Sequence, residues 1–266
     1  MKLKKLTMAL AVAALPAFAA PAQSAVLDAW QLVINGNTYD DIGRLSLTAG
    51  SAQIQQETPI AVGARFTEAG FIFSISYVQD NVVGAGDTTI FPSAFAPNDA
   101  LELVFTNVTG QVTSVGPGLG FGFDFQSGDL TIQTAITDTL LATGTVTGVG
   151  GTLQATPGIS GVNGESVTQV RIDSLFNGFA ILDSAGNPVD LSTALFEAVT
   201  NNQTTGVVGS GPCTFDATAN CITFNVNSNG DAFLVTQVPE PGTLALLGAS
   251  MAVLGFGALR RKKLGE

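Results

Sequence analysis

The sequence predicts an all-β protein, an antiparallel β-sandwich or jelly-roll-like domain that carries one short helix. Three observations support this class. Apolar residues alternate with polar ones over short runs, and clusters rich in Gly, Asn and Asp separate these runs. When the two ends of the chain are set aside, residues 26–236 remain, a length that suits one large β domain.

The strand prediction rests on period-two patterns, in which every second side chain faces the same side of a sheet. Residues 71–77 place Phe71, Phe73, Ile75 and Tyr77 on one face. The same alternation marks three further segments: Leu101, Leu103 and Phe105; Leu130, Ile132 and Ile136; and Ile222, Phe224 and Val226. We therefore expect half-buried antiparallel strands joined by turns.

Residues 190–199 interrupt the strand pattern. Leu191, Leu195 and Val199 recur at helical spacing behind a capping Asp or Ser, which predicts the one short helix. Residues 201–212 are polar and rich in Gly, so we expect a surface loop after the helix.

Two segments combine residue types that bind ligands in other proteins. Aromatic faces stack on sugar rings, but Phe121, Phe123 and Phe125 alternate as core residues do. Residues 35–41 gather oxygen ligands around a turn, as calcium prefers. This segment does not follow the twelve-residue calcium loop, and an Asn-Gly hairpin turn explains it equally well. We expect no metal, cofactor or catalytic site.

The N-terminus predicts export. Lys2, Lys4 and Lys5 form a positive region, and residues 6–20 form an apolar stretch. Small residues follow up to Ala25, as signal peptidase requires. We therefore expect residues 1–25 to be a signal peptide and the mature chain to start near Val26.

The C-terminus predicts a membrane anchor. Residues 243–259 form an apolar run without a charge, and a helix over them would rise about 25 Å, the short end of what spans a bilayer. A basic cluster follows and should stay on the cytoplasmic side, which places the preceding domain outside the inner membrane. This cluster consists of Arg260, Arg261, Lys262 and Lys263.

Residues 237–266 also carry a resemblance. The tetrapeptide Val238-Pro239-Glu240-Pro241, the apolar run and the basic cluster stand in the order of the PEP-CTERM sorting signal of Gram-negative bacteria, which this segment resembles. The resemblance implies that exosortase, an integral-membrane transpeptidase, recognises the Pro-Glu-Pro turn. It also implies cleavage near the motif, only a transient stay in the inner membrane, and release or re-attachment at the cell surface beside exopolysaccharide.

The composition of residues 26–236 limits the activities that this domain can have. Three arginines stand against nineteen Asp and Glu, a net charge of −16, so this surface repels nucleic acid. The chain has no histidine, which removes imidazole metal sites and histidine general bases. Carboxylate pairs remain possible for a hydrolase. The glutamates available are Glu57, Glu68, Glu102, Glu165 and Glu197, and their spacing singles out no pair.

Cys213 and Cys221 are the only cysteines, and export would place them in an oxidising compartment. A disulfide between them would close a short ring. A metal site is the alternative, but no further soft ligand accompanies the two thiols.

These features predict an exported, non-enzymatic cell-surface or matrix protein that exosortase processes and that associates with exopolysaccharide in a biofilm or floc. A module that binds carbohydrate or calcium is the first alternative. A carboxylate-dependent hydrolase is the second.

Overall fold

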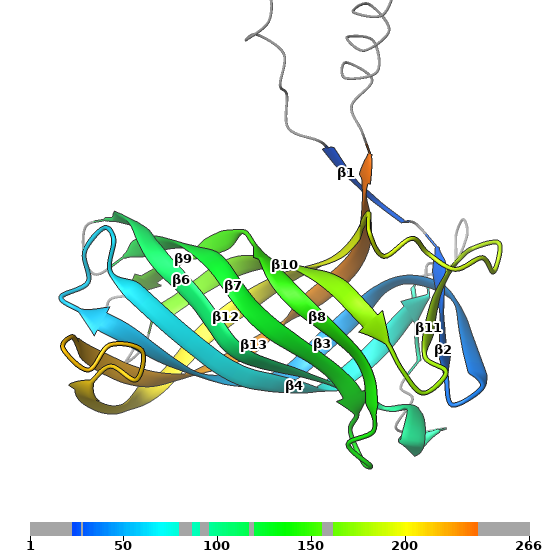
Figure 1. Ribbon diagram of the computed structural model, residues 1–266, viewed down its shortest axis with the longest axis horizontal. Helices are drawn as coiled ribbons and strands as arrows, with labels where there is room; N and C mark the ends of the chain where they lie inside the picture. The colour runs from blue at the N-terminus through cyan, green and yellow to red at the C-terminus, as the bar shows by residue number, and fades with distance from the viewer. Residues whose placement is uncertain are drawn as a thin grey trace, which may run out of the picture. The chain divides into compact units, whose positions relative to one another are not determined.

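The computed structural model describes residues 23–27, 29–79, 87–90, 96–116, 120–155 and 162–238 (Figure 1). Val26–Thr236 forms one compact unit. The expected signal peptide and the expected membrane helix lie almost wholly outside the described residues. Within the part of the chain that is described, no helix has the length and apolar character needed to cross a membrane.

The all-β class is confirmed, since every described strand pair is antiparallel and no α-helix occurs in the described ranges. One 3-10 turn, η1 (Pro97–Asp99), precedes β6. The strands are β1 (Gln23–Val26), β2 (Trp30–Ile34), β3 (Asn37–Thr58), β4 (Arg65–Gln79), β5 (Thr88–Ile90), β6 (Leu101–Val115), β7 (Phe121–Thr134), β8 (Leu140–Gly148), β9 (Gly150–Ala155), β10 (Val162–Leu175), β11 (Ala180–Asp183), β12 (Ala194–Pro212) and β13 (Asn220–Val238).

One continuous sheet supplies both facing layers that a sandwich requires. Its order runs from β13 through β12, β10, β8, β7, β6 and β4 to β3, and β3 pairs with β13 again, so the sheet closes on itself. Twelve residue pairs join β3 to β13, from Thr58 opposite Asn220 to Leu45 opposite Ala232. The strands therefore curve around a shared interior, as Figure 1 shows.

Apolar side chains fill this interior. Trp30 and Tyr77 are fully buried, and the ring of Trp30 meets Phe196 edge-on at 5.6 Å. The expectation for β7 is confirmed, because Phe121, Phe123 and Phe125 are all buried. Edge-to-face aromatic packing of this kind stabilises a core beyond the area that it buries.

The predicted helix at residues 190–199 is wrong. Asp190 accepts hydrogen bonds from the backbone N–H and the hydroxyl of Ser192, and this forms a tight turn instead of a helix cap. Ala194 then begins β12, which pairs with β10 on one side and β13 on the other. Pairing with a strand on each side stabilises this segment as a strand, and this outweighs the helical spacing of its three apolar residues.

The predicted surface loop at residues 201–212 is also wrong, because these residues continue β12 and pair with β13 as far as Pro212. Two bulges, at Thr204/Gly206 and Val207/Gly209, interrupt the ladder. The segment is polar because most of its side chains are exposed, and its backbone is ordered by the partner strand rather than by burial.

The faces of β3 and β4 exchange at a kink, which corrects the prediction that residues 71–77 present one apolar face. Ile75 and Tyr77 are buried, whereas Phe71 is 40% and Phe73 49% exposed. In β3, next to these residues, Ala49 has a positive φ of 55°. A Cβ atom added to the neighbouring Gly50 would lie only 2.7 Å from the carbonyl oxygen of Ser228 on β13. The close approach of β13 thus requires glycine, and the kink turns two phenylalanines outward.

Candidate binding groove and interior cavity

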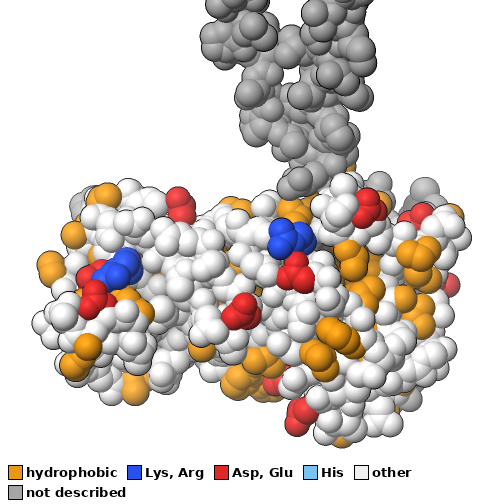
Figure 2. Space-filling view, in the orientation of Figure 1, with side chains coloured by type: hydrophobic (Ala, Val, Ile, Leu, Met, Phe, Trp, Pro, Cys, Tyr) orange, Lys and Arg blue, Asp and Glu red, His pale blue; other side chains and the backbone are white. Residues whose placement is uncertain are grey.

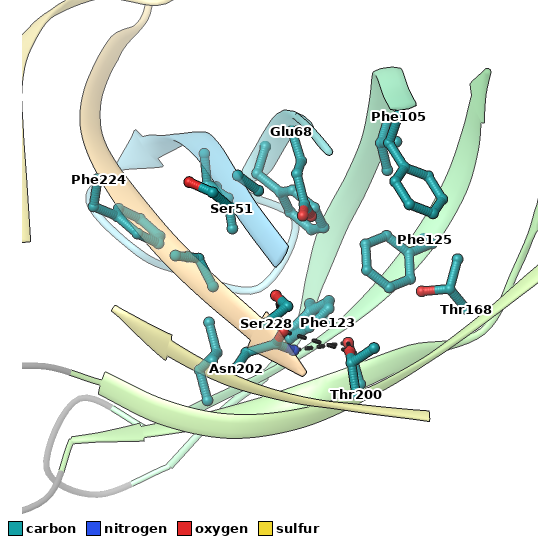
Figure 3. A pocket seen from close by; sticks show the side chains of 18 of the residues that line it. Ser51, Glu68, Phe105, Phe123, Phe125, Thr168, Thr200, Asn202, Phe224 and Ser228 are labelled. Atoms are coloured by element: carbon teal, nitrogen blue, oxygen red, sulfur yellow. Dashed lines mark hydrogen bonds between the residues drawn. The ribbon is translucent and has the colours of Figure 1, made fainter. Parts of the chain in front are cut away.

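An interior cavity of about 80 Å³ lies inside the closed sheet (Figure 3). The aromatic part of its lining comes from β4, β6, β7 and β13: Phe66, Phe71, Phe105, Phe121, Phe123, Phe125 and Phe224. The same cavity receives one carboxyl group, that of Glu68 on β4.

Glu68 has no hydrogen-bond or ion-pair partner among the described residues. Glu68 lines the cavity, and its carboxyl group points into it (Figure 3). Burial raises the pKa of Glu68 from 4.5 to about 7, because the ionised form loses its water without gaining a donor. Glu68 is therefore a proton-binding group near neutral pH.

A small polar network forms another part of the cavity wall. The carboxamide of Asn202 donates to the hydroxyl of Ser166 at 2.8 Å and accepts a hydrogen bond from the hydroxyl of Ser228 at 2.6 Å. The hydroxyls of Ser166 and Thr200 are 2.8 Å apart. Asn202 and Ser228 also line a second, outer hollow, so the two hollows share one wall of the sheet.

The second hollow is an open groove of about 1070 Å³, and we name it the carboxamide groove. It crosses the sheet where β3 is kinked at Ala49 and where β13 has a bulge between Ser228 and Gly230. Bulges bend strands and are frequent beside functional sites.

Two cross-strand rows of side chains line the carboxamide groove. In each row the residues are direct partners on neighbouring strands, so they share a face of the sheet. The first row runs through Gln154, Asn163, Gln203, Asn227 and Ser51; the partner of Ser51 on β4 is Phe71, which lines the interior cavity. The second row, two residues away along the strands, runs through Thr152, Glu165, Asn201 and Asn229.

The carboxamides of these rows make no hydrogen bond with any described protein group. Most of them are exposed, and each presents both donors and an acceptor to solvent. Beside Ser51, Phe73 of the groove lining stacks on Phe71 with ring centroids 5.4 Å apart and an interplanar angle of 30°. The groove therefore joins free amide groups to an exposed aromatic pair.

Each arginine of the described domain is neutralised by neighbouring carboxylates. Arg44 pairs with Asp87 and Asp231, and Arg171 pairs with Asp173. Arg65 pairs with Glu57 and Asp216. In Figure 2 the basic side chains in view have acidic ones beside them. No unpaired arginine is present in the described ranges, so this domain offers an acidic polymer no cationic patch.

The turn at residues 35–41 binds a carboxylate of the chain itself. Asp99 accepts hydrogen bonds from the side-chain amides of Asn35 and Asn37 at 2.8 and 2.7 Å, and from the hydroxyl of Tyr39 at 2.6 Å. Asn35 and Gly36 both have positive φ, as an Asn-Gly hairpin turn requires. The described residues include no group of three or more acidic or sulfur side chains arranged to hold a metal ion.

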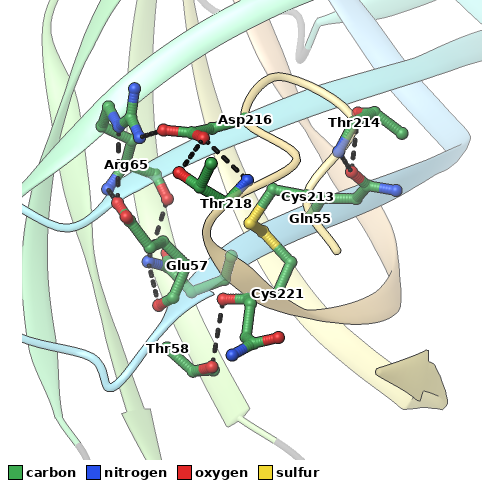
Figure 4. The surroundings of a disulfide bond; sticks show 11 residues. Gln55, Glu57, Thr58, Arg65, Cys213, Thr214, Asp216, Thr218 and Cys221 are labelled. Atoms are coloured by element: carbon green, nitrogen blue, oxygen red, sulfur yellow. Dashed lines mark hydrogen bonds and ion pairs between the residues drawn. A yellow bond between two sulfur atoms is a disulfide. The ribbon is translucent and has the colours of Figure 1, made fainter. Parts of the chain in front are cut away.

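The predicted disulfide between Cys213 and Cys221 is present (Figure 4). The ring that it closes contains Asp216, whose carboxylate accepts hydrogen bonds from the guanidinium of Arg65 at 2.7 Å and from the hydroxyl of Thr218 at 2.6 Å. The hydrogen bond from Thr218, followed by that from Arg65, lowers the pKa of Asp216. The ring is thereby attached to β4 and does not project freely from the domain.

We expect the double substitution Cys213→Ser/Cys221→Ser to lower the free energy of unfolding by about 2.5 kcal/mol, because the unfolded chain regains the entropy of a short closed ring. Urea unfolding of the variant and of the reduced wild-type protein measures this change. Equal stability of the oxidised and reduced forms would contradict the expectation.

The predicted sorting residues lie at or beyond the C-terminal end of the described residues. Val238 is the last residue of β13, whereas Pro239, Glu240, Pro241 and the basic cluster at residues 260–263 fall outside the described residues. Sequence reasoning missed the carboxamide rows and the isolation of Glu68. Only the local density of Asn and Gln at residues 201–203 and 227–229 pointed to the rows.

The described unit is an acidic all-β domain, and a C-terminal segment with the sequence features of a sorting signal follows it. A family model for the PEP-CTERM protein-sorting motif matches residues 237–262. The chain is thus a protein with a C-terminal PEP-CTERM motif, which confirms the resemblance seen in the sequence. The motif implies an exported protein that exosortase sorts, with membrane anchoring during sorting in Gram-negative bacteria. Comparisons with curated proteins and with solved structures found no match.

Proposed function

We propose that this chain is a non-enzymatic cell-surface or matrix protein that is released from its C-terminal anchor by exosortase and retained in an exopolysaccharide layer of a biofilm or floc. The observation that carries the proposal is the PEP-CTERM match at residues 237–262, which begins where β13 ends. A sorting address directly behind a β domain suits a protein delivered to the outside of the cell.

The features of the described domain support a binding or structural role. The cavity and the carboxamide groove are each lined by one carboxyl group, Glu68 and Glu165 respectively. Hydrolysis of glycosides by the usual route uses two carboxyl groups that flank the scissile bond. Binding of carbohydrate is the second candidate function, and the free carboxamides of the groove favour it over binding of calcium.

Mass spectrometry of the surface form tests the sorting part of this proposal. We expect a C-terminus upstream of the apolar run at residues 243–259, and we expect Pro239→Ala/Pro241→Ala to accumulate with its tail intact. Pro188→Ala, a proline change inside the domain, serves as the control and should be processed normally. A surface form that retains residues 260–266, or normal processing of the double variant, would refute exosortase processing.

A further inference from the structure

The carboxamide groove combines features that select a ligand by chemistry. Carboxamides pair with hydroxyl groups in both directions, because each carries two donors and one acceptor with two lone pairs. The row through Gln154, Asn163, Gln203 and Asn227 has no described protein partner, so its hydrogen-bonding groups are available to a ligand. A hydroxyl-rich ligand satisfies such a row without bringing a charge.

The aromatic end of the groove adds a second kind of contact. Phe71 and Phe73 are exposed and stacked, whereas the three phenylalanines of β7 are buried. The face of an aromatic ring is electron-rich and attracts weakly positive C–H groups, which a sugar ring presents on its own face. Exposure of two large apolar side chains beside a polar groove is typical of a binding surface.

The length of the groove indicates an extended ligand. The groove lining spans six neighbouring strands, from β9 to Phe73 on β4, and five strand spacings of about 4.8 Å amount to roughly 24 Å. Several consecutive sugar units of an extended chain fit such a length, whereas a monosaccharide would occupy only one end.

Charge excludes acidic polymers from the same surface. Glu165 lies in the second row of the groove, and all three arginines of the domain are paired with carboxylates. The domain as a whole has a net charge of −16. A polyanion would meet repulsion here without any cation to offset it.

We propose that the carboxamide groove binds an extended, neutral polysaccharide, with the amide row hydrogen-bonding to ring hydroxyls and the Phe71/Phe73 pair stacking on one sugar face. This inference rests on the proposed retention in a polysaccharide layer and names the chemistry of that layer.

Binding measurements on the exported protein, purified in the form that the cells retain, test the inference. The probes are dextran and a soluble β-glucan, which are neutral, and alginate, which is acidic, and each is tested with and without calcium. We expect saturable binding to at least one neutral probe and none to alginate. Gln203→Ala/Asn227→Ala should weaken the neutral interaction about ten-fold or more, equivalent to at least about 1.4 kcal/mol, and Phe73→Ala should weaken it as well.

The matched control is Gln53→Ala/Asn225→Ala. Gln53 and Asn225 are also exposed opposite partners on β3 and β13, but they lie outside the groove lining. This variant should bind like the wild type, and thermal unfolding should confirm that all variants are folded. Absence of binding to both neutral probes, preference for alginate, or an equal loss in the control variant would overturn the inference. None of these outcomes affects the mass-spectrometric result on processing.

Discussion

Glu68→Gln is expected to stabilise the domain at pH 8 and to remove much of the pH dependence of its stability between about pH 4.5 and pH 7. The pKa of Glu68 is near 4.5 in an unfolded chain and about 7 in the folded one. Within that window the folded state holds a proton that the unfolded state has lost. The free energy of unfolding of the wild type therefore falls as the pH rises, by up to about 3 kcal/mol.

Urea unfolding of wild type and variant at several pH values measures this effect. The difference between the two proteins isolates Glu68, because other carboxyl groups titrate in both. Glu165→Gln, which changes an exposed glutamate without a described partner, should keep the wild-type pH profile. If the Glu68→Gln protein shows the wild-type slope from pH 4.5 to 7, Glu68 does not keep its proton in the cavity.

Asp99→Ala is expected to destabilise the domain by about 3 kcal/mol, because three donors lose a charged acceptor. Asp99 is 1% exposed and links the Asn35–Gly36 turn, Tyr39 of β3 and η1. Its backbone carbonyl also accepts a hydrogen bond from the hydroxyl of Tyr77 at 3.0 Å. Asp99→Asn should cost less, since it removes the charge and keeps the shape.

The pH dependence of Asp99 runs opposite to that of Glu68. Burial disfavours the charge of Asp99, but hydrogen bonds from Tyr39, Asn37 and Asn35 outweigh burial and lower its pKa. Its stabilisation is therefore present above about pH 4 and is lost as the pH falls through its lowered pKa. Asp129→Ala, which removes an exposed carboxylate that accepts a hydrogen bond from Asn107, is the control and should cost under 1 kcal/mol.

The two tyrosines of the chain provide a direct readout of this site. Burial, followed by the hydrogen bond to Asp99, raises the pKa of Tyr39, and burial raises that of Tyr77. In the Asp99→Asn protein, ultraviolet titration should show Tyr39 ionising at lower pH than in the wild type. Unchanged phenol titration together with unchanged stability would show that Asp99 is not the link between turn and core.

Local sequence patterns predicted the all-β class correctly, but they did not predict how the strands pair in three dimensions. The alternation at Leu101, Leu103 and Phe105 lies in β6, and that at Ile222, Phe224 and Val226 lies in β13. Closure of the sheet depends on pairing between β3 and β13, whose residues are far apart in the chain, so no short window contains it. The same limit explains why residues 201–212 were wrongly predicted to be a loop. They form a strand because β13 pairs with them.

The candidate sites divide in a similar way. The sorting motif is a contiguous signal and was readable, whereas the carboxamide groove gathers residues from six strands. Phe71 and Phe73 looked like core residues because strict alternation with Ile75 and Tyr77 assumes a straight strand. The kink at Ala49 breaks that assumption and depends on a backbone conformation that sequence patterns do not reveal. The Cys213–Cys221 pair was readable because its ring is short.

The pairing that closes the sheet has a consequence for secretion. The hydroxyl of Thr58 on β3 donates to the carbonyl of Asn220 on β13, across 162 residues of sequence. In any chain that crosses a membrane N-terminus first, an early strand such as β3 emerges before a last strand such as β13, so one edge of β3 would stay unpaired until β13 follows. Such an open edge invites pairing with other chains, and contacts this distant form slowly. β13 thus both closes the sheet and leads directly into the PEP-CTERM motif, so the last pairing of the fold adjoins the segment that the family model matches.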